Sequence, residues 1–303
     1  MDRYISFFLL ISLLGNSCSY KNNENIELSQ IAETALLNEL NSNQADSGLI
    51  MIADKTGEII TQSSLVLYGD TYKEGDTCIF NQPRYIGGLI SPFPIMVALK
   101  DKVLTPSDTV DVGNGTYTYK GARMVDHNYE QGGYGVLTAK QAFRYNSNIG
   151  MAKLILKRYE DNQMKLVSSM MELGFPIDTA NWNPTSLPWL AIGYETKISP
   201  IELIRLYGDI ANNRIEGYEN EIPVIKDMMS INGYPDDIEI AGKTGTIITS
   251  KEKEVSFCGY FTVDDSLYTC LVIISNPKKD YPSGGIMAGN VVKEIVNSLT
   301  VRK

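Results

Sequence analysis

Histidine and cysteine are scarce in this chain, which limits the metal chemistry it can support. The 303 residues include one His and four Cys, and these residues do not cluster in the sequence. Structural zinc sites need about four thiolate or imidazole ligands, commonly supplied as closely spaced pairs. The sequence therefore predicts no metal site, and nothing in it indicates a bound cofactor.

The chain also lacks an excess of positive charge, internal repeats and low-complexity tracts. Its 27 Lys and Arg residues against 36 Asp and Glu residues give a net charge of −9. Binding to nucleic-acid phosphates needs a basic surface, so we expect no nucleic acid as a partner. A hydrophobic content of 43% with 21% charged residues is typical of a globular protein, and the length allows a substantial core.

The apolar run near the N-terminus is too short to cross a bilayer. It covers Ile5–Leu14, follows one Arg, and has the length of the hydrophobic region of a signal peptide. Cys18 follows small residues, a context in which bacterial lipoproteins are cut and lipidated. We predict a lipoprotein-type signal peptide at 1–17, a polar tether at 18–27, and export to the periplasmic face of the inner or outer membrane with a lipid anchor at Cys18. The alternative is ordinary secretion, with Cys18 incidental.

Two of the remaining cysteines flank a predicted hairpin turn. Cys258 and Cys270 lie on either side of residues 263–266, so they could face each other on adjacent strands, and an exported protein can form disulfides. The alternative, which we favour, is that both are small buried hydrophobic residues.

Hydrophobic periodicity predicts an α+β fold. Runs rich in β-branched and aromatic residues predict strands at Gly48–Asp54, Glu58–Thr61, Ile238–Thr249, Val255–Thr262 and Leu267–Ser275. Helical spacing of apolar residues predicts helices at Ile26–Leu40, Pro94–Lys102 with Ser91 as N-cap, Leu137–Arg158 (which Gly150 could divide), Pro200–Asn212 and Gly289–Leu299. We expect a mostly antiparallel five-stranded sheet with helices on both faces, in one domain over residues 28–303.

The tetrapeptide Lys243–Thr246 is the most informative motif. It reads Lys-Thr-Gly-Thr, and serine enzymes that react with β-lactams carry such a motif together with a Ser-x-x-Lys nucleophile and a Ser-x-Asn triplet. Other segments match the family's order: Asp54–Glu58, Leu104–Pro106, Asp111–Gly115, Leu137–Thr138, Asn146–Ala152, Ala191–Gly193, Ser199–Pro200, Ala211–Asn212, Phe257–Phe261 and Val272–Pro277. From about Ile26 to Leu299 the chain therefore resembles the transpeptidase domain of class B penicillin-binding proteins.

The nucleophile motif departs from that family. Aligning Pro92 with the proline that usually follows the motif puts Gly88 at the serine position and Ser91 at the lysine position. A serine hydroxyl needs a neighbouring base, which the family's lysine supplies one helical turn later. Gly88 has no side chain to acylate, and Ser91 has no amine. The resemblance thus implies a transpeptidase-like fold with no catalytic residue intact.

The second motif keeps only part of its pattern. Asn146 stands where the family has a serine that helps to relay the proton, and an amide does not readily transfer protons. The resemblance implies that Asn148, together with Ser147, binds the amide of a substrate peptide. The alternative is that Asn146–Asn148 is simply a polar helix entry.

The third motif is complete. The resemblance implies that Lys243, Thr244, Gly245 and Thr246 bind substrate, and that backbone N–H groups near Thr246 and at Gly88 form an oxyanion hole. These donors need no side chain, so a binding groove could persist without catalysis. The alternative is that Gly242 and Gly245 serve sheet geometry alone.

Three further conspicuous residues have plain structural interpretations. His127 lies in a polar loop with no serine motif beside it, so we expect a surface histidine. Trp182 and Trp189 could line one side of the groove, but core or lid packing is the interpretation we favour.

Three functional hypotheses follow. The first is a non-catalytic homologue that binds a peptidoglycan stem peptide or a β-lactam, non-covalently at most, or a protein of cell-wall synthesis, along the edge of the Lys243 strand. The second is an active serine D,D-transpeptidase or carboxypeptidase that uses Ser91 or Ser147. The third is a structural or sensor protein with a vestigial groove.

Overall fold

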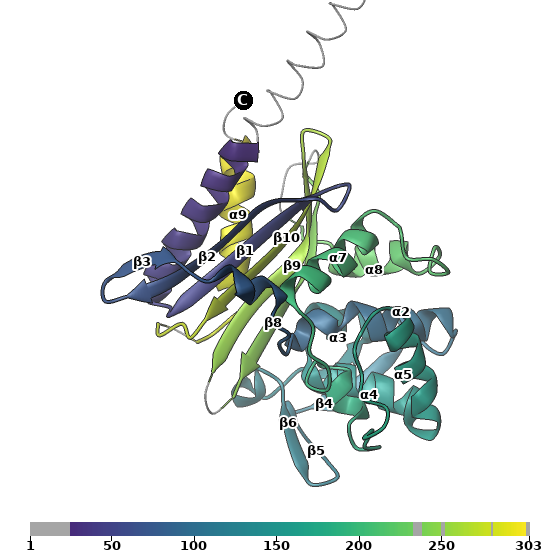
Figure 1. Ribbon diagram of the computed structural model, residues 1–303. Coiled ribbons are helices and arrows are strands. Elements are labelled where there is room, and N and C mark those ends of the chain that lie inside the picture. Colours follow the sequence, from purple (N-terminus) through teal and green to yellow (C-terminus); the bar gives the residue numbers. More distant parts are fainter. Residues whose placement is uncertain (1–24, 233–237, 250–251, 280, 301–303) are drawn as a thin grey trace, which may run out of the picture.

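The computed structural model describes residues 25–232, 238–249, 252–279 and 281–300. The predicted signal peptide, the lipidation site Cys18 and most of the predicted tether lie outside the described residues. The α+β fold is confirmed, with a central antiparallel sheet covered by helices on both faces (Figure 1).

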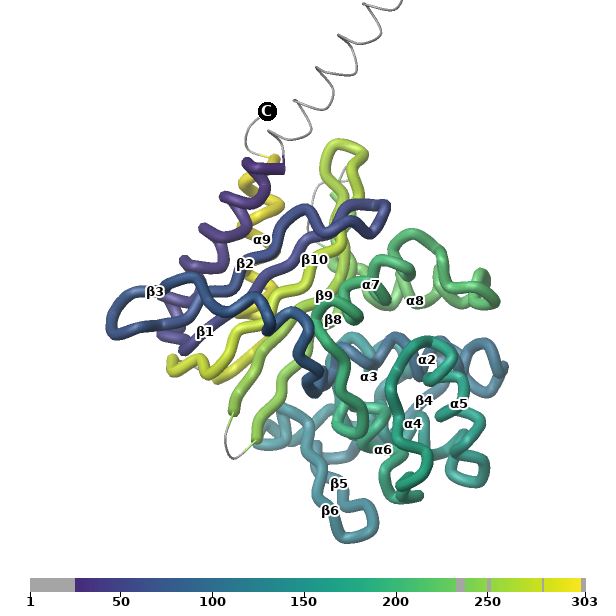
Figure 2. The backbone as a smooth tube through the Cα atoms, viewed as in Figure 1, coloured from purple at the N-terminus to yellow at the C-terminus, as the bar shows by residue number. Residues whose placement is uncertain are grey.

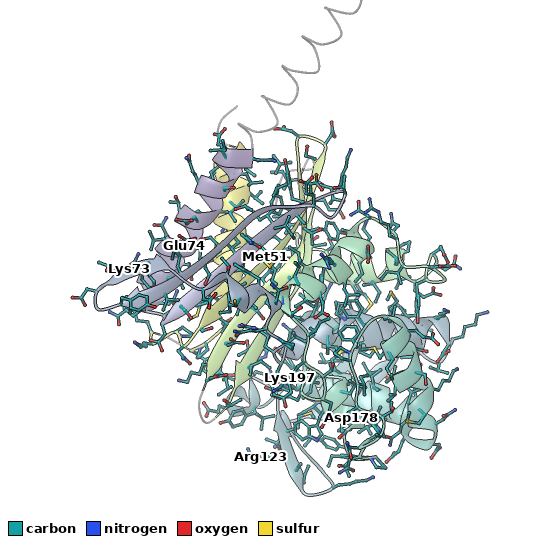
Figure 3. All side chains as sticks on the ribbon, in the orientation of Figure 1. Met51, Lys73, Glu74, Arg123, Asp178 and Lys197 are labelled. Atoms are coloured by element: carbon teal, nitrogen blue, oxygen red, sulfur yellow. The ribbon has the colours of Figure 1, made fainter. Side chains whose placement is uncertain are left out.

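The central sheet has six strands in the order β3-β2-β1-β10-β9-β8. Its strands are β1 (Ser47–Asp54), β2 (Ile59–Tyr68), β3 (Thr71–Glu74), β8 (Ile240–Ile248), β9 (Lys253–Val263) and β10 (Ser266–Ser275). The sixth strand, β3, was not predicted, because it is only 4 residues long and mostly exposed. Its charged residues Lys73 and Glu74 lie at the sheet margin (Figure 3), and charge on an edge strand disfavours pairing with other chains.

One face of the sheet is covered by two helices from opposite ends of the chain. Residues 25–43 are helical, and α9 spans Met287–Thr300. Figure 2 shows the two helices side by side, and Asn38 Nδ2 donates a hydrogen bond of 2.7 Å to Glu294 Oε1 between them. Ile50, Val272 and other apolar side chains of the sheet pack beneath this pair.

The other face carries the remaining helices and two small sheets. The helices are α2 (Pro92–Lys100), α3 (Ala139–Arg144), α4 (Asn148–Tyr159), α5 (Gln163–Glu172), α6 (Leu187–Leu190), α7 (Pro200–Ala211) and α8 (Ile222–Met229). The small sheets pair β4 (Thr109–Gly113) with β7 (Gly135–Thr138), and β5 (Thr116–Tyr119) with β6 (Ala122–Val125). Short 3-10 helices are η1 (Thr77–Asn81), η2 (Gly87–Ile90), η3 (Tyr129–Gln131) and η4 (Glu160–Asn162). Trp182 and Trp189 pack against the core of this face, which confirms the packing interpretation.

The predicted helix over 137–158 was wrong in its extent. Its first residues form β7, and a capping box between Thr138 and Gln141 starts α3. The break comes at residues 145–147 rather than at Gly150, because Asn146 has a left-handed backbone, with φ of 52°. Gly150 lies inside α4, where a β-carbon would stand 2.7 Å from Ala142 Cβ, so this glycine allows α3 and α4 to approach closely.

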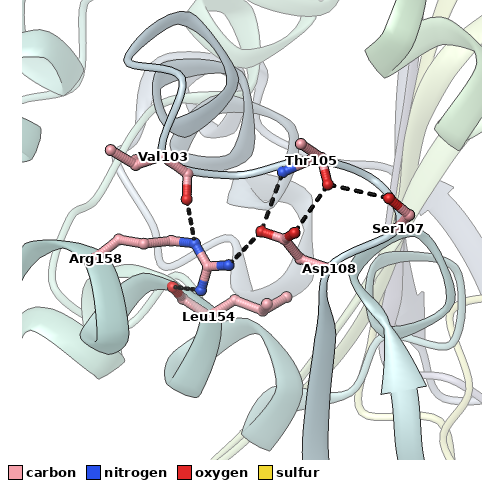
Figure 4. Close-up of polar contacts among 6 residues, drawn as sticks. All are labelled: Val103, Thr105, Ser107, Asp108, Leu154 and Arg158. Carbon is pink, nitrogen blue, oxygen red and sulfur yellow. Dashed lines mark hydrogen bonds and ion pairs between the residues drawn. The ribbon is translucent and has the colours of Figure 1, made fainter.

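The connection after α2 is fixed by one arginine of α4 (Figure 4). Arg158 forms an ion pair of 2.6 Å with Asp108 and donates a bond of 2.8 Å to the Val103 carbonyl oxygen. Asp108 also accepts a bond of 2.9 Å from the Thr105 hydroxyl. The two partners hold the pKa of the Asp108 carboxyl below its usual value, Arg158 more strongly than Thr105. These contacts join the family-like segment around Thr105 to α4.

The two cysteines of the last hairpin point to opposite faces of the sheet. Cys258 is paired with Leu271, and Cys270 with Gly259. Each side chain is fully buried, one in each of the two cores. The prediction of two small buried residues is confirmed, and both thiols are free.

Candidate functional site

Three distant segments meet at the outer edge of β8. They are η2, the turn between α3 and α4, and β8 itself, which is the last strand of the sheet. Gly88 lies directly against β8: a β-carbon at this position would be 2.7 Å from the Thr244 carbonyl oxygen and 3.3 Å from Asn146 Oδ1. The position aligned with the family's nucleophile therefore has no room for a side chain beside the present β8 backbone.

Asn146 connects the second and third motifs. Its left-handed backbone turns the side chain out of the helical path, and Nδ2 donates a bond of 2.5 Å to Thr244 Oγ1. Oδ1 accepts a hydrogen bond from Lys243 Nζ. The amide thus acts as both donor and acceptor in the place that the family gives to a hydroxyl.

Lys243 is buried, and its amine bonds to neutral groups. Its exposed fraction is 4%, and Nζ donates a bond of 2.5 Å to the Phe143 carbonyl oxygen and lies 4.3 Å from the centre of the Phe143 ring. In the described part of the chain no carboxylate forms an ion pair with this amine. Burial disfavours the charged form and lowers the pKa of Lys243 to about 7.

The two serines considered as alternative nucleophiles are both engaged within their own segments. Ser91 occupies the N-cap position of α2 as predicted, but its hydroxyl makes no capping bond and donates instead to the Gly88 carbonyl oxygen at 2.7 Å. Ser147 caps α4 instead: its Oγ accepts from the Gly150 N–H and donates to Asp126 Oδ2 at 2.7 Å. Both serines are buried, and across the described ranges neither hydroxyl bonds an amine side chain.

Asp126 is a structural residue of the site that the sequence did not reveal. The carboxylate is buried, accepts from Ser147 and takes a further bond of 3.0 Å from the Ile149 N–H. Burial raises the pKa of Asp126, and the hydrogen bonds from Ser147 and Ile149 oppose that shift. Its only sequence signal was the polar loop that also contains His127, which is exposed as predicted and lies 2.8 Å from the Tyr134 hydroxyl through Nε2.

The other predicted binding residues lie near this cluster with different exposure. The amide of Asn148 is half-buried and donates to the Val125 carbonyl oxygen at 3.0 Å, which ties α4 to β6. Thr246 is half-buried on β8. A β-carbon on Gly245 would lie 2.8 Å from the Ile86 carbonyl oxygen, and one on Gly242 would lie 2.4 Å from the Phe257 ring. Both glycines are therefore needed for the packing of the sheet, whatever else they do.

A cavity runs along the first half of the β8 edge. It has a volume of about 620 Å³, and Gly242–Thr244 form one side of it. Tyr145 and Asn146, the end of α8 and the beginning of α9 provide the other walls. The charged residues among its lining are Arg144, Lys243 and Lys293, so the cavity is locally basic in a protein of net charge −9.

The described ranges contain no group of three or more side chains suited to holding a metal ion. They also contain no helix with both the length and the apolar character needed to cross a membrane.

The sequence-family model described as the penicillin binding protein transpeptidase domain matches residues 50–297 of this chain. The chain is 23% identical to the probable peptidoglycan D,D-transpeptidase PenA of Neisseria flavescens, over 90% of this chain and 80% of that protein. It is also 23% identical to the peptidoglycan D,D-transpeptidase FtsI of Buchnera aphidicola, over 85% of this chain but only 54% of that protein.

Solved structures show the same fold. The transpeptidase domain of penicillin-binding protein 3 from Burkholderia pseudomallei has a TM-score of 0.71 at 19% identity, covering 91% of this chain and 94% of that one. The transpeptidase domain of the FtsI4 D,D-transpeptidase from Legionella pneumophila has a TM-score of 0.65 at 21% identity, covering 88% and 94%.

Proposed function

The chain belongs to the penicillin binding protein transpeptidase domain family, and on this premise we propose that it is an exported, non-catalytic member. Its ligand is a peptidoglycan stem peptide, or else a protein of the cell-wall machinery that offers a similar extended segment. The relatives are peptidoglycan D,D-transpeptidases, which act outside the cytoplasm, and a lipid anchor at Cys18 would hold this chain there.

The loss of catalysis is supported by the chemistry around Gly88. Acyl transfer through a serine needs a hydroxyl next to a base. Gly88 offers no hydroxyl, and Lys243, the nearby amine, bonds to Phe143 and Asn146 instead of a serine. Ser91 and Ser147 donate to Gly88 and Asp126, so their protons go to a carbonyl and a carboxylate within the fold.

The observation that carries the binding proposal is the basic cavity beside β8. Its wall includes the outer edge of a sheet, which can pair with an extended peptide through main-chain hydrogen bonds. Within the described ranges the segment before β8 pairs with the start of this edge, where Ile231 N–H donates to the Ile240 carbonyl oxygen at 2.8 Å, and η2 lies against Thr244. Lys243 supplies a buried amine with which no carboxylate of the described ranges forms an ion pair, so a peptide carboxylate is the group that best complements it.

Calorimetric titration with a synthetic stem peptide tests this function. We expect measurable binding to the wild-type protein, weaker binding of the same peptide with an amidated C-terminus, and loss of that difference in Lys243→Met. Lys120→Gln, which changes an exposed lysine of the β5–β6 turn, is the matched control and should bind as the wild type does. Equal affinity for the acid and amide peptides, or no binding at millimolar concentration, would contradict the proposal.

A further inference from the structure

The buried amine of Lys243 belongs to the wall of the cavity beside β8. The cavity has a volume of about 620 Å³, and Phe143, Asn146 and Lys243 all line it. Nζ is held between the other two, because it donates a bond of 2.5 Å to the Phe143 carbonyl oxygen and a second bond to Asn146 Oδ1. The residues that hold the amine therefore border the cavity, and this space is the route by which a small molecule reaches it.

The hydrogen bonds of Nζ match those of a neutral amine. A neutral amine has two N–H groups and one lone pair, whereas an ammonium group has three N–H groups. Among the described residues Nζ has two acceptors, the Phe143 carbonyl oxygen and Asn146 Oδ1. These use both N–H groups of the neutral form and leave its lone pair without a donor. The Phe143 ring, 4.3 Å from Nζ, favours the charged form, but less strongly than burial opposes it.

The described lining of the cavity places no carboxylate beside this amine. Its charged residues are Arg144, Lys243 and Lys293, and Tyr145 is its other titratable group. Burial lowers the pKa of Lys243 to about 7, and no carboxylate of this lining opposes the shift. A lysine desolvated in this way is the form of the residue that attacks carbonyl carbons.

We propose that Lys243 is a nucleophile that condenses with a small aldehyde carrying a carboxylate. The nitrogen lone pair attacks the aldehyde carbon and a C–N bond forms. The C–O bond then breaks, and the oxygen leaves as water with the two protons of the amine. The product is an imine, and the step consumes no oxidant or reductant. Arg144 and Lys293 make the cavity favour an aldehyde with negative charge.

This inference goes beyond stem-peptide binding and does not require it. A peptide carboxylate bound beside Lys243 would favour the charged amine, so a stem peptide that binds should slow imine formation. If no stem peptide binds, the reaction with the aldehyde is unaffected. A lactam carbonyl is much less electrophilic than an aldehyde, so the same chemistry does not extend to β-lactams.

Trapping the imine in the full-length protein tests the proposal. Glyoxylate is the probe, and cyanoborohydride reduces the imine to a stable N-carboxymethyl group that peptide mass mapping locates. At about pH 8, one unit above the pKa of Lys243, an ordinary exposed lysine is almost entirely protonated. We therefore expect Lys243 to be modified about tenfold faster than exposed Lys120. An equal or slower rate at Lys243 would overturn the proposal.

One variant separates the charge of the amine from its accessibility. Asn146→Asp keeps the size of the side chain and places a carboxylate beside Nζ, so the amine stays protonated and its modification should slow about tenfold or more. Asn81→Asp, at an exposed residue of η1, is the matched control and should react as the wild type does. Thermal unfolding checks that both variants are folded. Undiminished modification of Lys243 in Asn146→Asp would show that the neutral amine is not the reacting form, which would also overturn the proposal.

Discussion

Restoring a serine at residue 88 should destabilise the protein rather than reactivate it. The β-carbon of Gly88→Ser would lie 2.7 Å from the Thr244 carbonyl oxygen, well inside ordinary van der Waals contact. That oxygen belongs to the backbone of β8, which is paired with β9 along its whole length and cannot retreat as a flexible side chain could. The substitution therefore needs either a shift of η2 or a distortion of β8.

The magnitude follows from two opposing effects. Overpacking of this kind costs about 1–3 kcal/mol of unfolding free energy. Replacing a glycine whose φ is not positive lowers the conformational entropy of the unfolded chain. This effect raises the free energy of unfolding by about 0.4–1 kcal/mol. The net loss is on the order of 1–2 kcal/mol, and the melting temperature should fall by several degrees, at roughly 2–4 °C per kcal/mol in a domain of 150–250 residues.

Denaturant unfolding measures this effect directly. Gly88→Ala and Gly88→Ser should lose similar stability because the clash arises at the β-carbon and not at the hydroxyl. Gly285→Ser is the control, since the nearest atom to its new β-carbon is the Ser283 hydroxyl oxygen, 3.9 Å away. A Gly88→Ser protein as stable as the wild type, or a Gly88→Ser/Ser91→Lys protein that is acylated by a β-lactam, would refute the close contact with β8.

Three further predictions concern the polar groups and the thiols. Because the pKa of Lys243 is lowered to about 7, above pH 7 the unfolded chain holds a proton on this amine that the folded chain lacks. The free energy of unfolding should therefore rise by about 1 kcal/mol between pH 7.5 and 8.5. In denaturant titrations Lys243→Met should lack this rise, and an equal rise in both proteins would contradict the burial of the amine. Ser147→Ala should cost about 1–2 kcal/mol in the same assay, since it removes the α4 cap and a partner of buried Asp126; a neutral effect would show that the serine does not cap α4. Reductant should leave the melting temperature unchanged, because Cys258 and Cys270 face opposite sides of the sheet, and a fall would indicate a disulfide.

The sequence predicted the regular parts of the fold because burial imposes periodicity. The strands from β8 to β10 and the helix α7 were predicted to within a few residues, since each buries a regular set of apolar positions. The edge strand β3 was missed because an exposed strand carries no such pattern. The break between α3 and α4 was misplaced because Gly150 is a packing glycine, while the turn depends on the left-handed backbone of Asn146.

The sequence predicted which residues form the candidate site, but not which of their groups bond to one another. The motif order indicated that Gly88, Asn146 and Lys243 would meet, and the structure brings them together. Which groups bond to one another depends on distances that sequence spacing does not contain. Ser147 looked like a groove residue and is a buried helix cap, and Asp126, its partner, lies 21 positions away in a loop with no motif.

The most direct test of the central claim is the intact mass of the full-length protein after prolonged incubation with excess labelled β-lactam. We predict an unchanged mass, because no hydroxyl of the site is paired with an amine among the residues that the structure describes. A stoichiometric increase by the mass of the β-lactam, mapped by peptide sequencing to Ser91, Ser147 or any other serine, would contradict it.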